Sequence, residues 1–391
     1  MTVIHAPAAS ASGEMQGTLN RSAEMADLSG TIEVARVVLV IGLVFLHYFA
    51  YPNSRVPPFE GFDPNHHQVA TFVNSFVLFF FFSAVPLLST ISGWLFFGFS
   101  ARPWEAIRRR IGKRGWSLFV PLVIWNLGAL AIAFALRAVA PTSSLLGPFG
   151  IDFAHFGLWD GVDAVLGLTR LPVAFQFWFV RDLFVTVLVS PLLWLMLRHA
   201  PLPGAAVLCL AWIADFTFFG LFIRTDVLFF FYLGALARLR GVEPRVGWNT
   251  TKLLLLVYVV LMALRALAPL AFDPSQPDQR EMLDLFTRLA RPLGVVACWG
   301  LCLRLAATAW GEAIGRYGGF AFFLHAAHFP MIIFVKFVLW RLVPAETDAW
   351  MIAHYAASVA MTVAVAALGA AVIFRISPHL YGLLAGGRRL V

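Results

Sequence analysis

The sequence predicts an all-α polytopic membrane protein with about ten transmembrane helices and both termini in the cytoplasm. Three observations carry this prediction. Hydrophobic residues make up 60% of the 391-residue chain and charged residues only 13%, about half the charged share of soluble proteins. Long apolar runs recur along the chain, each near the roughly 20 residues that cross the hydrocarbon core of a bilayer. The Lys and Arg residues concentrate in alternate segments between these runs, which is the pattern of cytoplasmic loops.

The apolar runs define the expected elements in order. Residues 1–28 are polar and rich in Ala and Ser without an apolar core, so they are expected to form a disordered cytoplasmic tail, not a cleavable signal peptide. A transmembrane domain is expected over 29–377, followed by a cytoplasmic C-terminal stub at 378–391. The predicted spans of the transmembrane domain are 31–50, 70–98, 117–140, 174–197, 204–222, a short 226–238, 251–270, 290–309, 318–341 and 349–374.

Charge fixes the predicted orientation. With the N-terminus inside, the inner segments hold roughly twice as many Lys and Arg residues as the outer ones, and the largest cluster lies at 102–114. The net charge of +8 is therefore interpreted as a topology signal, and no nucleic-acid partner is expected. The three cysteines fall in apolar runs without CxxC spacing, which indicates small buried side chains. No Walker-type phosphate loop is present, which disfavours a nucleotide-driven pump.

The first span carries two ionisable residues on one face. Arg36 and His47 are eleven positions apart, so on a helix they share a face and lie about 16 Å apart along its axis. Ionisable groups in hydrocarbon cost on the order of 2.5 kcal/mol or more and normally face a bundle interior or a wet cavity. The pair is therefore a functional-site hypothesis, weighed against a snorkelling arginine and an interfacial histidine. Glu33, one turn earlier, is within reach of Arg36 and is expected to fix its side chain.

Two further sets of charges mark the third and fourth spans. Arg181 and Asp182 are neighbours, and adjacent helical side chains diverge by about 100°, so they are not expected to face each other. At least one should pair elsewhere or line a cavity, unless the two form structural ion pairs between helices. Lys113 and Arg114 lead into the third span. Their charges suit anionic lipid and a phosphorylated acyl donor equally well.

Smaller polar groups complete the candidate set. His325 and His328 lie three residues apart on one helical face of the ninth span. No third ligand is suggested nearby, so a metal site is not predicted, and a hydrogen bond to a polar substrate is favoured instead. Ser92 and Gly93 place small residues in mid-membrane, where they let helices approach closely.

Six segments follow one another along the chain: IEVARVVLVIGLVFLHYF, SGWLFF, KRGWSLFVPLVIW, FWFVRDLF, FFFYLGALA and FFLHAAHFP. In this order they resemble the acyltransferase 3 family of integral-membrane O-acyltransferases of bacterial surface and periplasmic glycans, which includes glucan succinyltransferases and exopolysaccharide acetyltransferases. The resemblance covers roughly residues 30–375. Its most specific part is the Arg, ten residues, His signature, which Arg36 and His47 match. Glu33 stands where the family more often has Asp and keeps the carboxylate.

The resemblance implies a multi-pass protein of the bacterial inner (plasma) membrane that moves an acetyl or succinyl group from cytoplasmic acyl-CoA to a hydroxyl of an extracytoplasmic or lipid-linked glycan. Acyl-CoA would be a co-substrate, without a bound cofactor. His47 would be the general base for the hydroxyl or would itself be acylated, since imidazole titrates near neutral pH. Arg36 would hold the acyl donor or stabilise the oxyanion. The other expected binding residues are Glu33, Lys113, Arg114, Arg181, Asp182, Ser92 and His325.

Acceptor choice is expected to lie in the outer loops 51–69 and 141–173, which are rich in Pro and Phe and include His66 and His67. Two other classes of protein remain alternatives. A secondary transporter or flippase of a glycan or small polar solute would also bury charges, with Arg181 and Asp182 in a proton relay. A structural subunit of a glycan synthase would keep its activity and fold in His47→Ala. The ordered motifs favour the acyltransferase.

Overall fold

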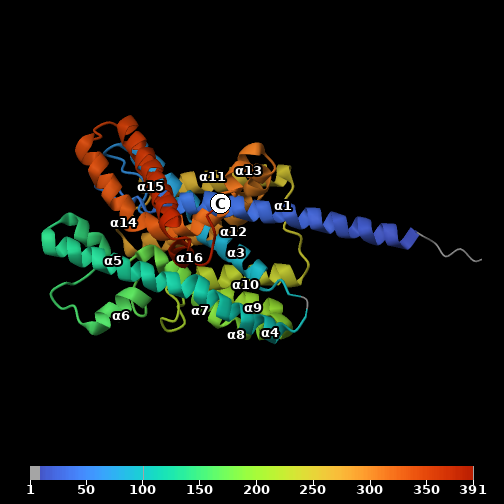
Figure 1. Cartoon of the computed structure of the whole chain (residues 1–391). Helices are drawn as coiled ribbons and strands as arrows, with labels where there is room; N and C mark the ends of the chain where they lie inside the picture. Colours follow the sequence, from blue (N-terminus) through green and yellow to red (C-terminus); the bar gives the residue numbers. More distant parts are fainter. Residues whose placement is uncertain (1–8, 100, 391) are drawn as a thin grey trace, which may run out of the picture.

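The computed structural model describes residues 9–99 and 101–390, with side chains described from residue 28 onward. Within that part of the chain every regular element is a helix (Figure 1), so the all-α prediction is confirmed. The predicted tail at 1–28 lies partly outside the described residues, which begin at Ala9. From there the backbone is helical and continues directly into the first apolar segment as α1, Ala9–Leu46.

The remaining helices are joined by turns and by loops of different lengths, the one between α1 and α2 covering residues 47–67. In chain order they are α2 Gln68–Phe81, α3 Ala84–Phe96, α4 Pro103–Arg114, η1 Gly115–Phe119, α5 Val120–Val139, η2 Ser144–Phe149, α6 Leu158–Leu166, η3 Phe175–Phe177, α7 Trp178–Leu188, α8 Ser190–His199, α9 Pro201–Ile213, α10 Asp226–Leu239, α11 Trp248–Ala266, η4 Ala268–Leu270, α12 Pro277–Ala306, α13 Ala309–Gly315, α14 Gly318–Leu342, α15 Asp348–Ile376 and α16 Pro378–Leu384.

Among the described residues, seven helical stretches are long and apolar enough to cross a membrane, or eight if α7 and α8, bent by 60°, form one span. Each of the ten predicted apolar runs contains a helix. The runs at 204–222 and 226–238, however, hold only α9 and α10, of 13 and 14 residues, which are shorter than a bilayer crossing. The backbone leaves the helix after Ile213, with positive φ at Asp215, Phe218 and Phe219, a break that hydropathy does not detect. Ten spans and cytoplasmic termini therefore stay predictions.

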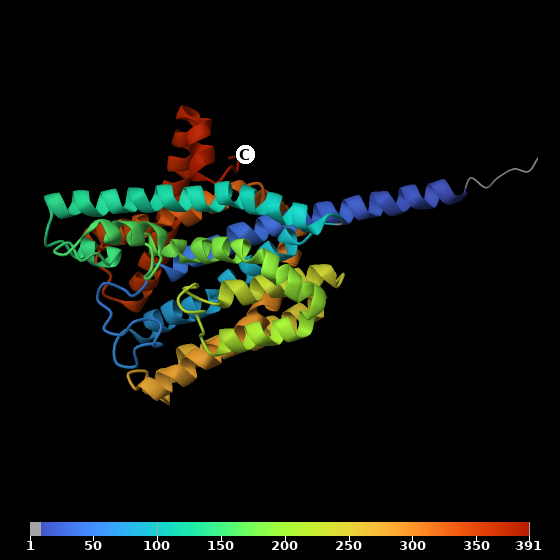
Figure 2. The same cartoon turned by 90° about the horizontal axis from the view of Figure 1, so that it is seen from below.

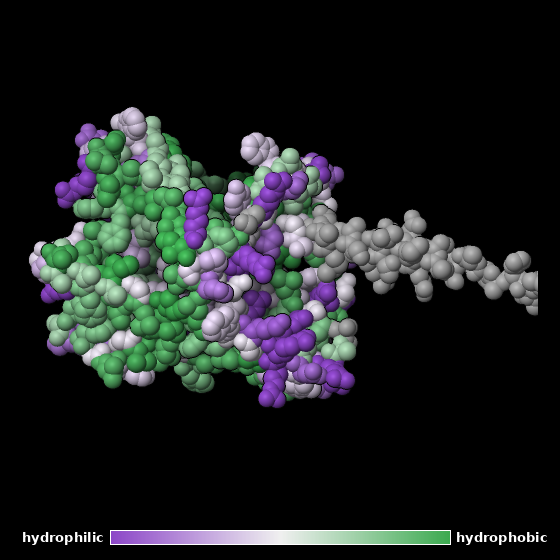
Figure 3. All heavy atoms as spheres, viewed as in Figure 1, coloured by the Kyte–Doolittle hydropathy of each residue, from purple (hydrophilic) through white to green (hydrophobic). Residues whose placement is uncertain are grey.

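Helix α1 occupies the middle of the bundle, where it packs against α2, α3, α12, α14 and α15. Both views show α1 and α5 running along the long axis of the molecule (Figures 1 and 2). Hydrophobic residues cover most of the face seen in Figure 3, and hydrophilic residues gather at its right-hand end, where α4 and α13 lie. Exposed Arg108, Arg109 and Lys113 of α4 belong to this end of the molecule.

The closest helix contact joins α3 and α10. Gly93 lies against the backbone of Phe231, and Gly234 lies against the backbone of Thr90, so a Cβ atom at either glycine would overlap a carbonyl oxygen of the other helix. Small residues are therefore required on both sides. This agrees with the close approach expected at Ser92 and Gly93, and Ser92 itself lines one of the cavities described next.

Candidate active site

Four cavities follow one another through the bundle, and neighbouring cavities share lining residues. A basic vestibule of about 290 Å³ is lined by Arg110, Lys113 and Arg114. It shares Leu95 and Arg114 with an arginine cavity of about 80 Å³. That cavity shares Phe179 and His325 with a central cavity of about 480 Å³. The central cavity in turn shares Arg224, Asp226 and Arg291 with an ion-pair cavity of about 450 Å³.

His47 lines the central cavity directly after the last residue of α1 and is 6% exposed. Its Nδ1 lies 2.8 Å from Nε2 of His328 on α14, and the two ring planes are within 9° of parallel. Nδ1 of His328 is 3.2 Å from the carbonyl oxygen of Leu324. A carbonyl only accepts, so in the neutral ring His328 Nδ1 carries the hydrogen and Nε2 accepts from His47 Nδ1. Nε2 of His47 is then left with its lone pair.

Two neighbours hold the His47 ring and its backbone in place. The Phe175 ring packs edge-on against the imidazole, with centroids 4.9 Å apart. Lys336 of α14 donates to the carbonyl oxygens of Tyr48 and Ala50 at 3.0 and 3.1 Å. Carbonyls at the C-terminal end of a helix have no partner within the helix, and a cation there also complements the helix dipole. The end of α1 that carries His47 is thus fixed from α14.

Arg36 lines the arginine cavity at the other end of the same helix segment, so the two residues face one row of cavities. Its guanidinium pairs with Glu33, which confirms the expected contact, and both side chains are 32% exposed. Gly318 of α14 leaves the space that the Glu33 carboxylate occupies. Ser92 and Arg114 line this cavity too.

Arg388, beyond α16, also lines the arginine cavity. Its place inside the bundle was not predicted, because the segment 378–391 was interpreted only as a stub. Burial, together with the neighbouring charges of Arg36 and Arg114, lowers the pKa of Arg388. Among the described residues, the cavity therefore gathers three guanidiniums, of Arg36, Arg114 and Arg388, beside the Glu33 carboxylate, which suits an anionic ligand.

His325 separates the arginine cavity from the central cavity. It is 3% exposed, its ring lies against Phe177 and Phe179, and neither ring nitrogen has a hydrogen-bond partner among the described residues. The His325 ring lines both cavities, so it lies beside a ligand held in either one. The predicted hydrogen bond of His325 to a polar substrate is compatible with this place.

Arg181 and Asp182 differ from expectation. Arg181 Nη1 donates to the Asp182 carboxylate at 2.8 Å and also to the Leu221 carbonyl. The prediction that they do not face each other was wrong. It considered only the directions of the two Cα–Cβ bonds, whereas the long Arg181 side chain bends back and reaches the Asp182 carboxylate. Neither residue lines any of the four cavities. Asp182 instead accepts the backbone N–H groups of Ile223 and Arg224 at 3.1 and 2.8 Å.

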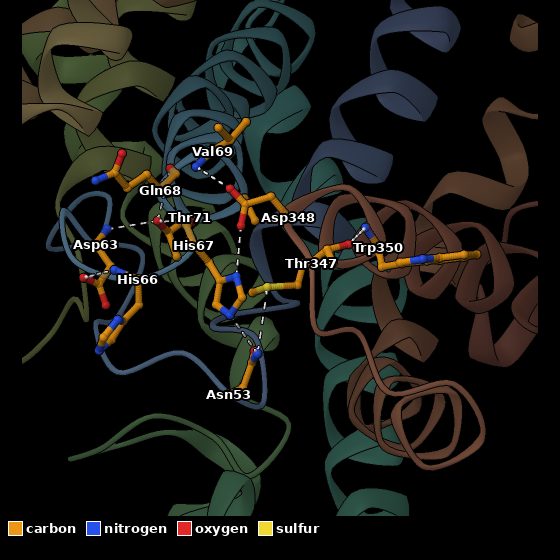
Figure 4. A network of polar contacts seen from close by, with 12 residues as sticks. Asn53, Asp63, His66, His67, Gln68, Val69, Thr71, Thr347, Asp348 and Trp350 are labelled. Atoms are coloured by element: carbon orange, nitrogen blue, oxygen red, sulfur yellow. Dashed lines mark hydrogen bonds and ion pairs between the residues drawn. The ribbon is translucent and has the colours of Figure 1, made fainter.

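The outer loops contribute to the cavity walls. Phe59 of the 51–69 loop lines the central and ion-pair cavities, and Pro148 and Leu171 of the 141–173 loop line the central one. Figure 4 shows how the first loop is held: His67 Nδ1 lies 3.0 Å from the Asp348 carboxylate at the start of α15, and the other carboxylate oxygen accepts the Val69 N–H at 2.9 Å.

The loop containing His66 is shaped locally. The Asp63 carboxylate accepts the backbone N–H groups of Asn65 and His66 at 2.8 and 3.1 Å (Figure 4). This side-chain turn, which is typical of Asp, brings the chain round into α2. The His66 side chain lines none of the four cavities, and neither does that of His67.

Comparison with known proteins gives two matches. A sequence model described as an acyltransferase domain matches residues 30–371. The chain is also 24% identical over 371 residues to the succinoglycan biosynthesis protein ExoH of Rhizobium meliloti (strain 1021), covering 93% of each chain. No solved structure matches.

Proposed function

Because the chain belongs to the acyltransferase 3 family of membrane acyltransferases, we propose that it transfers an acetyl or succinyl group from cytoplasmic acyl-CoA to a hydroxyl of an extracytoplasmic or lipid-linked glycan. The single observation that carries the proposal is the hydrogen-bonded pair of His47 and His328, whose remaining basic nitrogen belongs to a residue of the central cavity. A glycan acceptor is supported by the relative, which is named for succinoglycan biosynthesis.

The acyl donor would enter from the basic vestibule. Lys113 is exposed at this mouth and Arg114 lies between the vestibule and the arginine cavity, so the two side chains are placed to bind the phosphates of CoA. Arg36 and Arg388 would hold the donor deeper in the bundle. The proposal puts this end, and both chain termini, in the cytoplasm of a bacterium, with the helical bundle in its inner membrane.

The transfer step needs a base and a path for one proton. The hydroxyl oxygen of the glycan attacks the thioester carbonyl carbon while Nε2 of His47 takes the hydroxyl proton. The C–S bond of the tetrahedral intermediate then breaks, and the proton passes from His47 to the departing thiolate. The products are an O-acyl ester and free CoA, so atoms and charge balance. His325, which lines the central cavity with His47, would stabilise the developing oxyanion from the side of the acyl donor.

His328 acts on this step through His47. By accepting from Nδ1 it holds the imidazole in the tautomer whose Nε2 is unprotonated, and it fixes the direction of the ring. The same bond stabilises the imidazolium that forms when His47 takes the proton. His328 is thus a positioning residue, comparable in role to the orienting member of a catalytic triad.

Donor turnover tests the proposal. Purified full-length protein in nanodiscs is given acetyl-CoA or succinyl-CoA with acceptor glycan, and free thiol is followed for wild type and His47→Ala. Release that the substitution abolishes would support the transferase and identify the acyl group. The matched control is His354→Ala, which removes another buried histidine that lines none of the four cavities. Background release from a folded wild type would overturn the proposal in favour of a transporter.

A further inference from the structure

Arg224 enters the central cavity from the turn between α9 and α10. Its side chain lines both the central and the ion-pair cavity, and its guanidinium lies over the Trp178 ring, 5.0 Å from the centroid. Its backbone N–H is held by Asp182. The side chain is thus positioned from two sides, by a cation–π contact and by a fixed backbone.

The charges around these cavities are paired, with one exception. Asp226 accepts from Arg291 Nη1 and from Trp212 Nε1, both at 2.6 Å. In the ion-pair cavity, Arg288 lies 3.3 Å from the carboxylate of Asp215. Within the described part of the chain, the Arg224 guanidinium has no hydrogen bond and no ion pair with a carboxylate. The lining of the central cavity thus includes two guanidiniums, of Arg224 and Arg291, and one carboxylate, of Asp226.

Arg224 is exposed, so its guanidinium donors stay available to water or to a ligand in the cavity. Leu, Phe and Pro side chains make up most of the central cavity's lining. One negative charge would neutralise the site, and the planar guanidinium matches a carboxylate in shape. A phosphate monoester carries about 1.5 to 2 charges at neutral pH and would overcompensate. The balance points to a single carboxylate.

We propose that Arg224 binds the carboxylate of a substrate held in the central cavity beside His47. The inference rests on the proposed function, because it specifies which substrates that site takes. Two sources have this chemistry: the far end of a dicarboxylic acyl group such as succinyl, and an acidic sugar of the acceptor glycan. Either would place its carboxylate between the reacting centre and the ion-pair cavity.

Binding tests this without turnover, on the full-length protein in nanodiscs. One arm compares S-(3-carboxypropyl)-CoA with its uncharged amide. The other compares glucuronate with glucuronamide. We expect wild type to bind the acid roughly tenfold more tightly than the amide in one arm, as for a charge-assisted hydrogen bond, and Arg224→Gln to lose this preference. The arm that responds identifies the source of the carboxylate.

Two variants guard the interpretation. Arg224→Lys keeps the charge without the planar fork, so it should retain part of the preference even if Arg224→Gln folds poorly. Arg341→Gln removes an exposed arginine that lines none of the four cavities and should behave as wild type. Equal binding of acid and amide in both arms, or a preference that survives Arg224→Gln, would overturn the inference. Absence of thiol release would count against the proposed function alone, since these arms need no transfer.

Discussion

Nδ1 of His47 and Nε2 of His328 lie 2.8 Å apart although the residues are 281 positions apart in the chain. This hydrogen bond joins the end of α1 to α14. The other ring nitrogen of His328 donates to the backbone carbonyl of Leu324, so the pair is anchored on the α14 backbone. A hydrogen-bond acceptor behind the imidazole is what a catalytic histidine needs to keep one tautomer.

The first prediction concerns this acceptor. His328→Leu removes it, and we expect kcat to fall on the order of 10²-fold with little change in KM for acyl-CoA, because proton transfer suffers and binding does not. His328→Gln, whose carbonyl can accept from His47, should recover most of the rate. Steady-state kinetics on variants of equal folded fraction measure this. Equal loss in both variants would assign His328 a purely structural role.

The second prediction separates binding from stability at Arg388. Its charge is crowded by Arg36 and Arg114, so Arg388→Gln relieves repulsion in the empty protein. We expect the melting temperature to stay the same or rise while KM for acyl-CoA increases about tenfold, as when a charge-assisted bond to phosphate is lost. The neighbouring exposed Arg389, changed to Gln, is the control. An unchanged KM would remove Arg388 from the donor site.

The third prediction tests the α3–α10 contact. A Cβ at Gly234 would overlap the Thr90 carbonyl oxygen, and such overpacking typically costs about 1–3 kcal/mol. Gly234→Ala should therefore lower the unfolding temperature in detergent. Gly369→Ala in α15 is the matched control, because nothing lies within 4 Å of its Cβ position. There the helix should gain about 0.5–1 kcal/mol. Similar stability changes in both variants would contradict the close contact.

The fourth prediction concerns the loop in Figure 4. Asp348→Asn weakens the pairing with His67 that holds the 51–69 loop on α15. A pair exposed to about a third contributes at most about 1 kcal/mol, so the fold should persist. We expect KM for the acceptor glycan to rise and KM for acyl-CoA to stay constant. Asp152→Asn, in the exposed pair with His155, should change neither. A shift confined to acyl-CoA would contradict an acceptor role.

Patterns within one helix were predictable from the sequence, and partners across helices were not. The shared face of Arg36 and His47 and the reach of Glu33 follow from helical periodicity, and the structure agrees with both. The sequence indicated only that His328 lies on the same helical face as His325. The contact of His328 with His47 could not be predicted, because no local pattern shows which helix packs against α1. Arg224 lies in the turn between the short helices α9 and α10, and no local sequence pattern distinguishes it from other arginines.

Arg181 illustrates the opposite error. Its place in an apolar run suggested that it lines a cavity. Its guanidinium instead donates to Asp182 and to the Leu221 carbonyl. A buried arginine can form its ion pair with an acidic residue next to it in the chain. The three-dimensional structure is needed to show which arginine is left without such a pair and can bind a ligand. The sequence does show the neighbouring pair of Arg181 and Asp182. In the structure this pair holds the loop before α10, because Asp182 accepts the backbone N–H groups of Ile223 and Arg224.

The position of His325 between the arginine cavity and the central cavity has a consequence for the cell. An enzyme that works on both sides of a membrane must not discharge the ion gradients that the membrane maintains. The arginine cavity is the smallest of the four, at about 80 Å³, and the side chains of Phe179 and His325 line both it and the central cavity. In the proposed reaction, the side chains that stand between the donor and acceptor cavities would also limit the leak of ions through the bundle.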